Sequence, residues 1–229
     1  MISSYFQKRH KIDTEKSKPQ MIHDETRTIQ LSKNSYVITG KVPEECVPDF
    51  AEMMSLRPHV PDTVIMMGKP VLTPRFVAHY LKPYYYTGRT HEAKPLPEVF
   101  TPLLKWANEY LLPKWAEEHS LPKGDVKFNQ VLVNYYMNGL HYIGKHSDDE
   151  KQLLQGYPIF SASFGESRTF RIRTKTDDSI VHDHIMENGS FLLMCGDMQK
   201  EFKHEVPKML GKKAENCLPR INVTFRVFK

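Results

Sequence analysis

The C-terminal half of the chain is a succession of short segments in which apolar and polar residues alternate between turns. Alternation over about four to eight residues is typical of half-buried β-strands. We predict strands over residues 130–136, 158–164, 169–173, 179–185, 190–195 and 220–228. Many short strands at this spacing favour a sandwich, a barrel or a double-sheet jelly roll. The second half of the chain is therefore expected to form a β core.

The N-terminal half combines strand-like, helical and irregular segments. Strands are predicted over residues 29–42 and 60–67. Residues 43–55 and 97–119 have a helical spacing of apolar residues, and Pro113 should break or kink the second segment into a helix pair. Residues 70–97 are rich in Pro and Tyr and predict long irregular loops, which often carry binding surfaces. We therefore expect an α+β domain with N-terminal helices packed on one side of the β core.

The composition of the 229-residue chain is that of an ordinary globular domain. Hydrophobic residues make up 40% and aromatic residues 11%, enough to bury a core. No apolar run approaches the ~20 residues of a membrane span, and residues 1–6 lack the apolar core of a secretory signal. Three widely spaced cysteines indicate a reducing compartment without a disulfide framework or a Cys-x-x-Cys zinc site. The net charge of +5 is compatible with a polyanionic partner but does not require one.

The last predicted strand separates apolar from polar residues face by face, because successive side chains of a strand point to opposite sides. One face is apolar and consists of Ile221, Val223, Phe225 and Val227. The other face is polar and consists of Arg220, Asn222, Thr224 and Arg226. A half-buried strand with one solvated face would show the same alternation.

A second strand argues that the polar face points into a pocket. Asn134 and Tyr136 share one face of the strand predicted just upstream of His146. These side chains and the two arginines could converge on one inward site. Buried arginines need anionic partners, and their planar fork binds carboxylates at two points. Nothing nearby in the sequence supplies such anions, so a bound dicarboxylate would account for the pattern.

Candidate metal ligands stand between these two strands. His146 and Asp148 lie two residues apart and can face the same way, and His204 follows after a long gap. Two imidazoles and one carboxylate are the ligand set of iron(II) sites that activate oxygen. The triplet His182-Asp183-His184 is a rival set, but its polar surroundings favour an exposed strand or hairpin.

In their order along the chain, these residues resemble the AlkB family of iron(II)- and 2-oxoglutarate-dependent dioxygenases, which repair alkylated nucleobases. The resemblance covers roughly residues 60–229. The matching motifs are Val133-Asn134-Tyr135-Tyr136, His146-Ser147-Asp148-Asp149-Glu150, Arg168-Thr169-Phe170, His204-Glu205-Val206-Pro207-Lys208 and Arg220-Ile221-Asn222-Val223-Thr224-Phe225-Arg226. The run Asp148-Asp149-Glu150 most resembles the members that act on double-stranded DNA. The fold implied is a double-stranded β-helix, a variant of the jelly roll.

The resemblance also implies roles for the site residues. Iron(II) would be held by His146, Asp148 and His204. The distal carboxylate of 2-oxoglutarate would be held by Arg220, Asn134 and Tyr136. Arg226 would hold the carboxylate near the metal, with Asn222 and Thr224 as neighbours.

Residues implied to bind the substrate fall in the part where the resemblance is weakest. A base inside a duplex must be flipped out to reach a buried metal, and something must fill the gap. Met67 would be the tip of an intercalating hairpin finger where many relatives have an aromatic residue, although a core methionine would fit the same sequence. A base-holding loop would include Tyr84, Tyr86 and Thr87, and an ordinary Tyr-rich turn is the alternative.

Charged residues complete the implied substrate site. Glu150 would bind the exocyclic group of the flipped base, or else be a surface charge beside Asp149. Contacts to phosphates would come from Lys69, Arg75, Arg89 and Lys145, each of which could instead be an unremarkable surface charge.

The function that the resemblance implies is oxidative demethylation of N-alkylated bases, such as 1-methyladenine and 3-methylcytosine, in DNA. The reaction would consume O2 and 2-oxoglutarate and release formaldehyde, succinate and CO2. The same chemistry on RNA, on a protein or on a small molecule would need the same iron and co-substrate residues. A non-catalytic nucleic-acid-binding module on a jelly roll is a third hypothesis.

The domain organisation expected from this reading is simple. Residues 1–26 are polar and charge-dense and predict a flexible basic tail. Residues 27–229 would form a single dioxygenase domain, with a substrate-lid and helical part over residues 27–127 and the catalytic core over residues 128–229. We expect a monomer that acts inside the cell, in the nucleus or the cytoplasm, and does not bind membranes.

Overall fold

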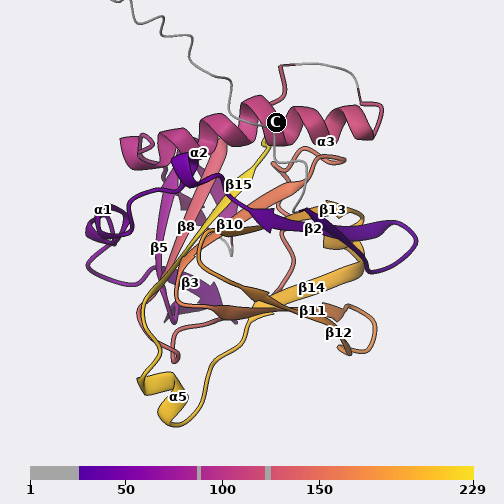
Figure 1. Ribbon diagram of the computed structural model, residues 1–229. Coiled ribbons are helices and arrows are strands. Elements are labelled where there is room, and N and C mark those ends of the chain that lie inside the picture. Colours follow the sequence, from indigo (N-terminus) through magenta and orange to yellow (C-terminus); the bar gives the residue numbers. More distant parts are fainter. Residues whose placement is uncertain (1–25, 87–88, 122–124) are drawn as a thin grey trace, which may run out of the picture.

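The computed structural model describes residues 26–86, 89–121 and 125–229 (Figure 1). The tail predicted over residues 1–26 falls almost wholly outside these ranges. Two antiparallel sheets form the body of the domain. The larger has seven strands, in the order β1 (Arg27–Gln30), β2 (Ser35–Lys41), β13 (Ser190–Gly196), β10 (Ile159–Gly165), β15 (Arg220–Arg226), β8 (Gln130–Tyr136) and β5 (Phe76–Tyr80).

The smaller sheet has four strands, in the order β12 (Ile180–Met186), β11 (Arg168–Thr174), β14 (Phe202–Val206) and β9 (Ile143–His146). Apolar side chains of both sheets meet in one cluster, in which Leu132 and Leu192 come from the larger sheet and Ile172 from the smaller. Two antiparallel sheets around such a core are the predicted jelly-roll arrangement. The six strands predicted after residue 128 are all present.

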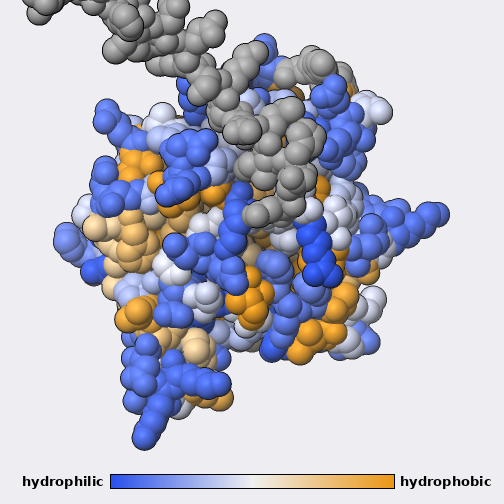
Figure 2. Space-filling model, viewed as in Figure 1, coloured by the Kyte–Doolittle hydropathy of each residue, from blue (hydrophilic) through white to orange (hydrophobic). Residues whose placement is uncertain are grey.

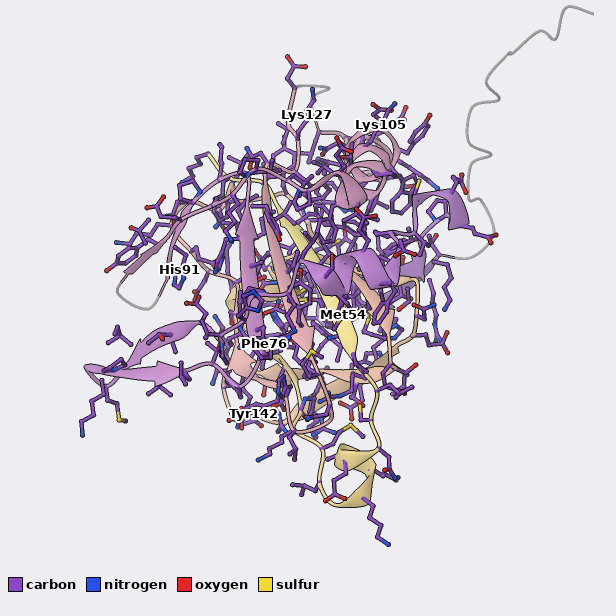
Figure 3. The ribbon with its side chains drawn as sticks, turned by 90° about the vertical axis from the view of Figure 1, so that its left-hand side faces the viewer. Met54, Phe76, His91, Lys105, Lys127 and Tyr142 are labelled. Carbon is purple, nitrogen blue, oxygen red and sulfur yellow. The ribbon has the colours of Figure 1, made fainter. Side chains whose placement is uncertain are left out.

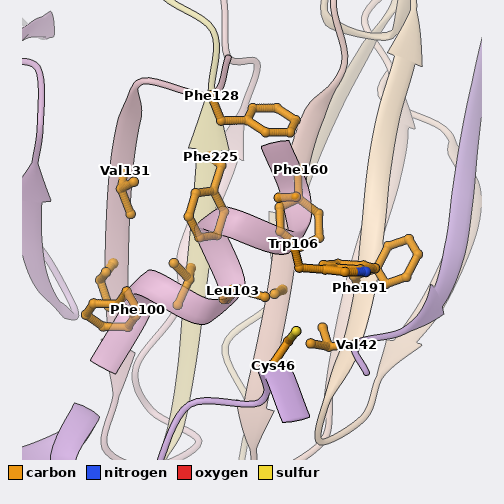
Figure 4. Close-up of a cluster of buried hydrophobic side chains, with 14 of the residues drawn as sticks. Val42, Cys46, Phe100, Leu103, Trp106, Phe128, Val131, Phe160, Phe191 and Phe225 are labelled. Carbon is orange, nitrogen blue, oxygen red and sulfur yellow. The ribbon is translucent and has the colours of Figure 1, made fainter. Parts of the chain in front are cut away.

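A helical layer covers the outer face of the seven-stranded sheet (Figure 1). Its segments are η2 (Glu98–Phe100), α2 (Thr101–Trp106), the π-helical turn η3 (Ala107–Leu111) and α3 (Leu112–Glu118). In Figure 4, Trp106 lies against the sheet, where its ring packs edge-on against Phe160 and Phe191 at centroid distances of 5.8 and 5.7 Å. The predicted α+β architecture with helices on one side is confirmed.

Of the break or kink predicted at Pro113, the break is not found, because helical structure continues from Thr101 to Glu118. Proline has no N–H to donate to the preceding turn, and in a regular helix its ring also clashes there. The π-helical turn Ala107–Leu111 changes the hydrogen-bond spacing directly before the proline. A wider turn therefore joins α2 to α3 where a break was expected.

The helix predicted over residues 43–55 is also wrong in part, since it consists of two short pieces. These are η1 (Glu44–Cys46) and α1 (Phe50–Ser55). Pro48 disfavours a helical backbone at Val47, which is extended at φ −73° and ψ 119°. The Asp49 side chain then caps α1 by accepting the N–H of Glu52 at 2.7 Å.

The irregular loops predicted over residues 70–97 are wrong as well. Strand β3 (Thr63–Met66) pairs with β4 (Lys69–Leu72), and β6 (Tyr84–Tyr86) pairs with β7 (Arg89–His91). Between these hairpins, β5 forms the edge of the seven-stranded sheet beside β8. The strands of this segment have three to five residues each and prolines within or between several of them, so they are too short to show an alternation.

Two short helices, the cysteines and the surface complete the description of the fold. One-turn helices α4 (Met198–Glu201) and α5 (Lys212–Glu215) precede β14 and β15. Cys46, Cys195 and Cys217 are free thiols, as predicted. Figure 2 shows a face that is mostly hydrophilic with small scattered hydrophobic patches. Within the described ranges, no helix combines the length and apolar character that crossing a bilayer needs.

Candidate active site

Two histidines lie opposite each other on neighbouring strands of the four-stranded sheet. His146 ends β9 and His204 lies in β14, and the antiparallel register pairs them directly. Their ring centroids are 4.2 Å apart. Nδ1 of His146 lies 2.9 Å from the carbonyl oxygen of Gly144, which fixes the proton on Nδ1 and leaves the lone pair on Nε2. The predicted strands included neither β9 nor β14, so the sequence did not reveal how these rings meet.

Asp148 follows β9 and reaches the same point. Its Oδ1 lies 3.6 Å from Nε2 of His146. One ligand atom from each of His146, Asp148 and His204 lies within 4.8 Å of the others. Three donors this close, from two strands and the turn that follows one of them, can share a single metal ion.

The turn that carries Asp148 is fixed at two points. The Ser147 hydroxyl donates to the Phe202 carbonyl at 2.8 Å. The Asp148 N–H donates to Oε1 of Gln199, also at 2.8 Å. These bonds tie the turn to β14 and α4, so the carboxylate is held in place by its backbone as well as by its own contacts.

Burial and neighbouring charges set the protonation of the triad. Burial, with a smaller effect of His146, lowers the pKa of His204 to about 3. Burial also lowers the pKa of His146, against the opposing effect of Asp148. Burial alone would raise the pKa of Asp148, but the Arg226 guanidinium and the two imidazoles lower it to about 2. At neutral pH the triad thus offers two neutral imidazoles and one carboxylate, the donor set that suits iron(II).

Arg220 lies on the polar face of β15, as predicted from the alternation. The register pairs Arg220 with Tyr136 and Asn222 with Asn134. Arg220 is 1% exposed, and its Nη2 donates to the Ser163 hydroxyl at 2.7 Å. Its Nε and Nη1 have no hydrogen-bond partner among the described residues, although the guanidinium lies over the Tyr136 ring at 5.0 Å. A buried cation with unused donors fits a carboxylate ligand.

Arg226 is equally buried but is engaged with the triad. Its Nη2 lies 2.9 Å from Oδ2 of Asp148, and its Nη1 donates to Oε1 of Gln130 at 3.1 Å. The side chain is 3% exposed. Arg226 therefore orients the Asp148 carboxylate in this structure, and its expected contact with a co-substrate carboxylate stays a prediction.

The serines of β10 complete the polar face, and sequence reasoning assigned them no role in the site. Asn222 donates to the Ser161 hydroxyl at 2.8 Å, and the Thr224 hydroxyl donates to Oδ1 of Asn222 at 3.1 Å. Ser163 is the partner of Arg220. The signal was available, because serines at 161 and 163 alternate with buried apolar residues along β10, the neighbour of β15.

One pocket joins the two halves of the site. It is lined by Leu132, Asn134, Tyr136, Ile143, His146, Asp148, Ser161, Phe170, Met194, His204, Val206, Arg220, Asn222, Thr224 and Arg226. All nine residues that the sequence assigned to the metal and to the co-substrate belong to this lining. The donor chemistry of the triad fits a divalent metal, and the unused N–H groups of Arg220 fit the far end of a dicarboxylate.

Two alternatives from the sequence can now be judged. The rival triplet His182-Asp183-His184 lies on β12 at the edge of its sheet, and Asp183 is exposed and paired with Arg171 at 2.7 Å. Arg75 is not the surface charge that was considered. Its Nε donates to Oδ1 of Asn134 at 2.6 Å, which places Arg75 at the rim of the pocket.

Met67 lies at the tip of the β3–β4 hairpin. The side chain is fully exposed, so the alternative of a core methionine is wrong for this residue. Met67 and Gly68 form the two-residue turn with φ of 49° and 74°. Positive φ at both central residues is the type I′ geometry that suits tight hairpins, and it is strained for methionine. A strained, exposed apolar residue at a projecting tip is compatible with the predicted finger.

The other residues predicted to contact the substrate differ in burial and in their partners. Glu150 is half-buried, and burial raises the pKa of its carboxyl while Arg226 opposes the shift. Its Oε2 has no hydrogen-bond partner among the described residues, so it is not a solvated surface charge. Lys69 is exposed, whereas Lys145 is paired with Asp178. Thr87 lies outside the described residues, and only the backbone of Tyr84, Tyr86 and Arg89 is described.

Comparisons with known proteins identify similar chains. The family model of the 2OG-Fe(II) oxygenase superfamily matches residues 52–226. The protein named DNA oxidative demethylase ALKBH2 from Mus musculus is 38% identical over 106 residues, which are 43% of this chain and 43% of that protein. The protein named alpha-ketoglutarate-dependent dioxygenase alkB homolog 3 from Homo sapiens is 36% identical over 107 residues, 43% of this chain and 36% of that protein.

The match therefore spans less than half of the length of these curated relatives. Among solved structures, one titled "The structure of OsALKBH1" matches with a TM-score of 0.57 at 17% identity, over 88% of this chain and all of that chain. At this identity the likeness concerns the fold, and it confirms the predicted jelly-roll class.

Proposed function

This chain belongs to the 2OG-Fe(II) oxygenase superfamily, and we propose that it is an oxidative demethylase of N-alkylated nucleobases in DNA. The observation that carries the proposal is the joint site, in which a His-Asp-His triad and the partly unpaired Arg220 line one pocket. The choice of DNA draws support from the relatives named DNA oxidative demethylase. Iron(II) at the triad would supply the activation of O2 that the chemistry needs.

Different residues of the pocket would hold the metal and the co-substrate. The metal would be held by His146, Asp148 and His204. The distal carboxylate of 2-oxoglutarate would pair with Arg220, beside Tyr136 and Asn134. Arg226 would keep Asp148 ionised and oriented through the 2.9 Å contact, so that the metal-binding carboxylate does not swing toward the co-substrate. The apolar lining, with Leu132 and Phe170, would limit the water around the reacting groups.

The nucleobase would be recognised from the side of the hairpins. A flipped base pays the cost of unstacking, which falls when a side chain fills its place in the helix. Met67 projects from the β3–β4 tip and could fill that gap. Glu150 follows the triad closely and keeps one oxygen free of partners among the described residues. That oxygen could bond the exocyclic group of the alkylated base.

A panel of methylated oligonucleotides tests the proposal. Single-stranded DNA, duplex DNA and RNA carrying 1-methyladenine or 3-methylcytosine are incubated with the chain, iron(II), 2-oxoglutarate and ascorbate. We expect formaldehyde release from the methylated DNA, accompanied by faster succinate formation than with unmethylated controls, which should release no formaldehyde. Formaldehyde release from the RNA oligonucleotides alone would mean that the substrate of the same reaction is RNA. Succinate without formaldehyde would be uncoupled turnover with ascorbate as the reductant, and the substrate would then be sought among proteins and small molecules. If no succinate forms, the chain would be a non-catalytic binding module.

Substituting Met67 with asparagine should separate binding of duplex DNA from folding. Asparagine adopts positive φ readily, and Asn-Gly suits a type I′ turn, so the midpoint of thermal unfolding should hold or rise. Loss of a methionine wedge worth about 1.5 kcal/mol would weaken duplex turnover about 10-fold. Kcat/KM is measured on duplex and on single strand, and the single strand should be nearly unaffected. An equal loss on both strand states would remove the finger from the proposal.

A further inference from the structure

A second group of metal-type ligands lies outside the pocket. One ligand atom from each of Asp62, His79 and His91 lies within 4.8 Å of the others. Oδ2 of Asp62 is 2.9 Å from Nδ1 of His91 and 3.4 Å from Nε2 of His79, and the two ring centroids are 4.9 Å apart. Within the described residues, only this group and the triad of the pocket meet that criterion. The function proposed above uses none of the three.

The three side chains come from segments that the chain brings together only in the fold. Asp62 directly precedes β3, His79 lies in β5, and His91 ends β7. In Figure 3, His91 lies where the β6–β7 hairpin meets the body of the molecule, and the β3–β4 hairpin projects below it. Side chains of His91 and His79 are 3% and 10% exposed, and that of Asp62 is 18% exposed. The group thus lies at the common base of both hairpins and is most exposed to solvent at Asp62.

Hydrogen bonds from two backbone N–H groups orient Asp62. The Thr63 N–H donates to Oδ1 of Asp62 at 2.7 Å, which directs Oδ2 toward both imidazoles. The Thr73 N–H donates to the Asp62 carbonyl, also at 2.7 Å, and closes the base of the β3–β4 hairpin. Support of this kind around the ligand atoms is what orients side chains in metal sites.

We propose that Asp62, His79 and His91 bind a divalent transition-metal ion, with zinc as the best fit, and that this ion fixes both hairpins to the edge of the seven-stranded sheet. Imidazole and carboxylate donors bind zinc at about 2.0–2.2 Å, which separates tetrahedral ligand atoms by about 3.3–3.6 Å. The observed distances from Oδ2 of Asp62 to the two ring nitrogens, 2.9 and 3.4 Å, lie near that range, and the three ligand atoms lie within 4.8 Å of one another. A water molecule would take the fourth position on the exposed side.

Burial and hydrogen bonds set the protonation of the group. Burial lowers the pKa of His79, against the opposing hydrogen bond to Asp62. Burial would raise the pKa of Asp62, but hydrogen bonds from His79 and His91 bring it well below its usual range. A metal ion would replace the protons that these two hydrogen bonds use, so binding would release protons.

The position of the group gives the ion a structural consequence. His79 pairs with Leu132 in the sheet register, and Leu132 pairs with Thr224. Residues paired across strands share a face, so His79 lies on the same face as these two residues of the pocket lining. Binding at the group would therefore order the hairpin bases beside the pocket, and the ion is separate from the one in the pocket.

Metal stoichiometry of the full chain tests the proposal. Chelator-treated protein is titrated calorimetrically with Zn²⁺, and Co²⁺ absorption reports the geometry of each site. We expect two tight equivalents for the wild type, one for His91→Leu, and one for His146→Ala, which retains only the new site. The double variant should bind none. His184→Ala, which alters a histidine of the exposed triplet, should keep two.

Asp62→Asn is a second test in case the His91 variant misfolds. Asparagine retains the size of the side chain and the acceptor for the Thr63 N–H. This variant should also lose one equivalent while its circular dichroism stays that of the wild type. A wild-type stoichiometry of one, or an unchanged stoichiometry of two in Asp62→Asn and His91→Leu, overturns the proposal. These readouts need no turnover, so failure of the demethylation assay and failure of the second site are told apart.

Discussion

Replacing Asp148 with asparagine should abolish formaldehyde release while the protein remains folded. Asparagine has the shape of aspartate but lacks the charge that a 2-His-1-carboxylate site supplies to iron(II). The change also leaves Arg226 without the carboxylate that lies 2.9 Å away. Substitutions that only perturb the surroundings of metal ligands cost about 10- to 100-fold in affinity or activity, so the loss of a ligand should exceed about 100-fold.

The measurement pairs turnover with metal binding. Formaldehyde and succinate are followed on a methylated oligonucleotide, and iron(II) affinity is measured in the absence of oxygen. Asp183→Asn is the matched control, because Asp183 lies between two histidines on the exposed strand β12. That variant should keep wild-type turnover. Wild-type rates in Asp148→Asn, or a loss in Asp183→Asn of similar size, would move the metal away from the predicted triad.

The sequence was sufficient for the parts of the site that long strands carry. In β15 the period-two alternation runs over seven residues and predicted that Arg220 and Asn222 share a face. The same reasoning predicted a shared face for Asn134 and Tyr136 in β8. The structure pairs these residues across the two strands. A register shift by one residue would have sent all these side chains into the helix-facing core. The strong pattern therefore specified both the strand and the face.

The same reasoning failed where elements are short. β9 has four residues with a glycine and a lysine at its centre, so no alternation marks the strand that presents His146. Strands β4 to β7 are each bounded or interrupted by turn and proline residues, and were taken for loops. Asp62, His79 and His91 follow no ligand spacing along the chain, and only the packing of two hairpins against β5 brings them together.

Substituting Arg220 with methionine should stabilise the ligand-free protein and at the same time abolish tight binding of 2-oxoglutarate. The guanidinium is 1% exposed, and its Nε and Nη1 have no hydrogen-bond partner among the described residues. Burying such a group costs free energy that only a ligand carboxylate returns, although Ser163 and the face of Tyr136 offset part of it. Methionine fills a similar length without a charge, so the free energy of unfolding should rise by about 1 kcal/mol or more.

The same substitution should weaken the binding of 2-oxoglutarate, because the donors that are unpaired in the ligand-free protein are the ones that would bind the carboxylate. Removing charge-assisted bonds to a buried carboxylate costs at least ~1.5–3 kcal/mol, or about 10- to 150-fold in Kd. Thermal unfolding without ligand and calorimetric titration with 2-oxoglutarate and Mn²⁺ measure the two effects. Arg173→Met is the control, because Arg173 is paired with Glu205 at 2.7 Å in the other sheet. That change should lower stability and leave the affinity alone. An Arg220→Met protein that is less stable than the wild type would mean that the guanidinium stabilises the fold. One that binds 2-oxoglutarate as tightly as the wild type would mean that the dicarboxylate binds elsewhere.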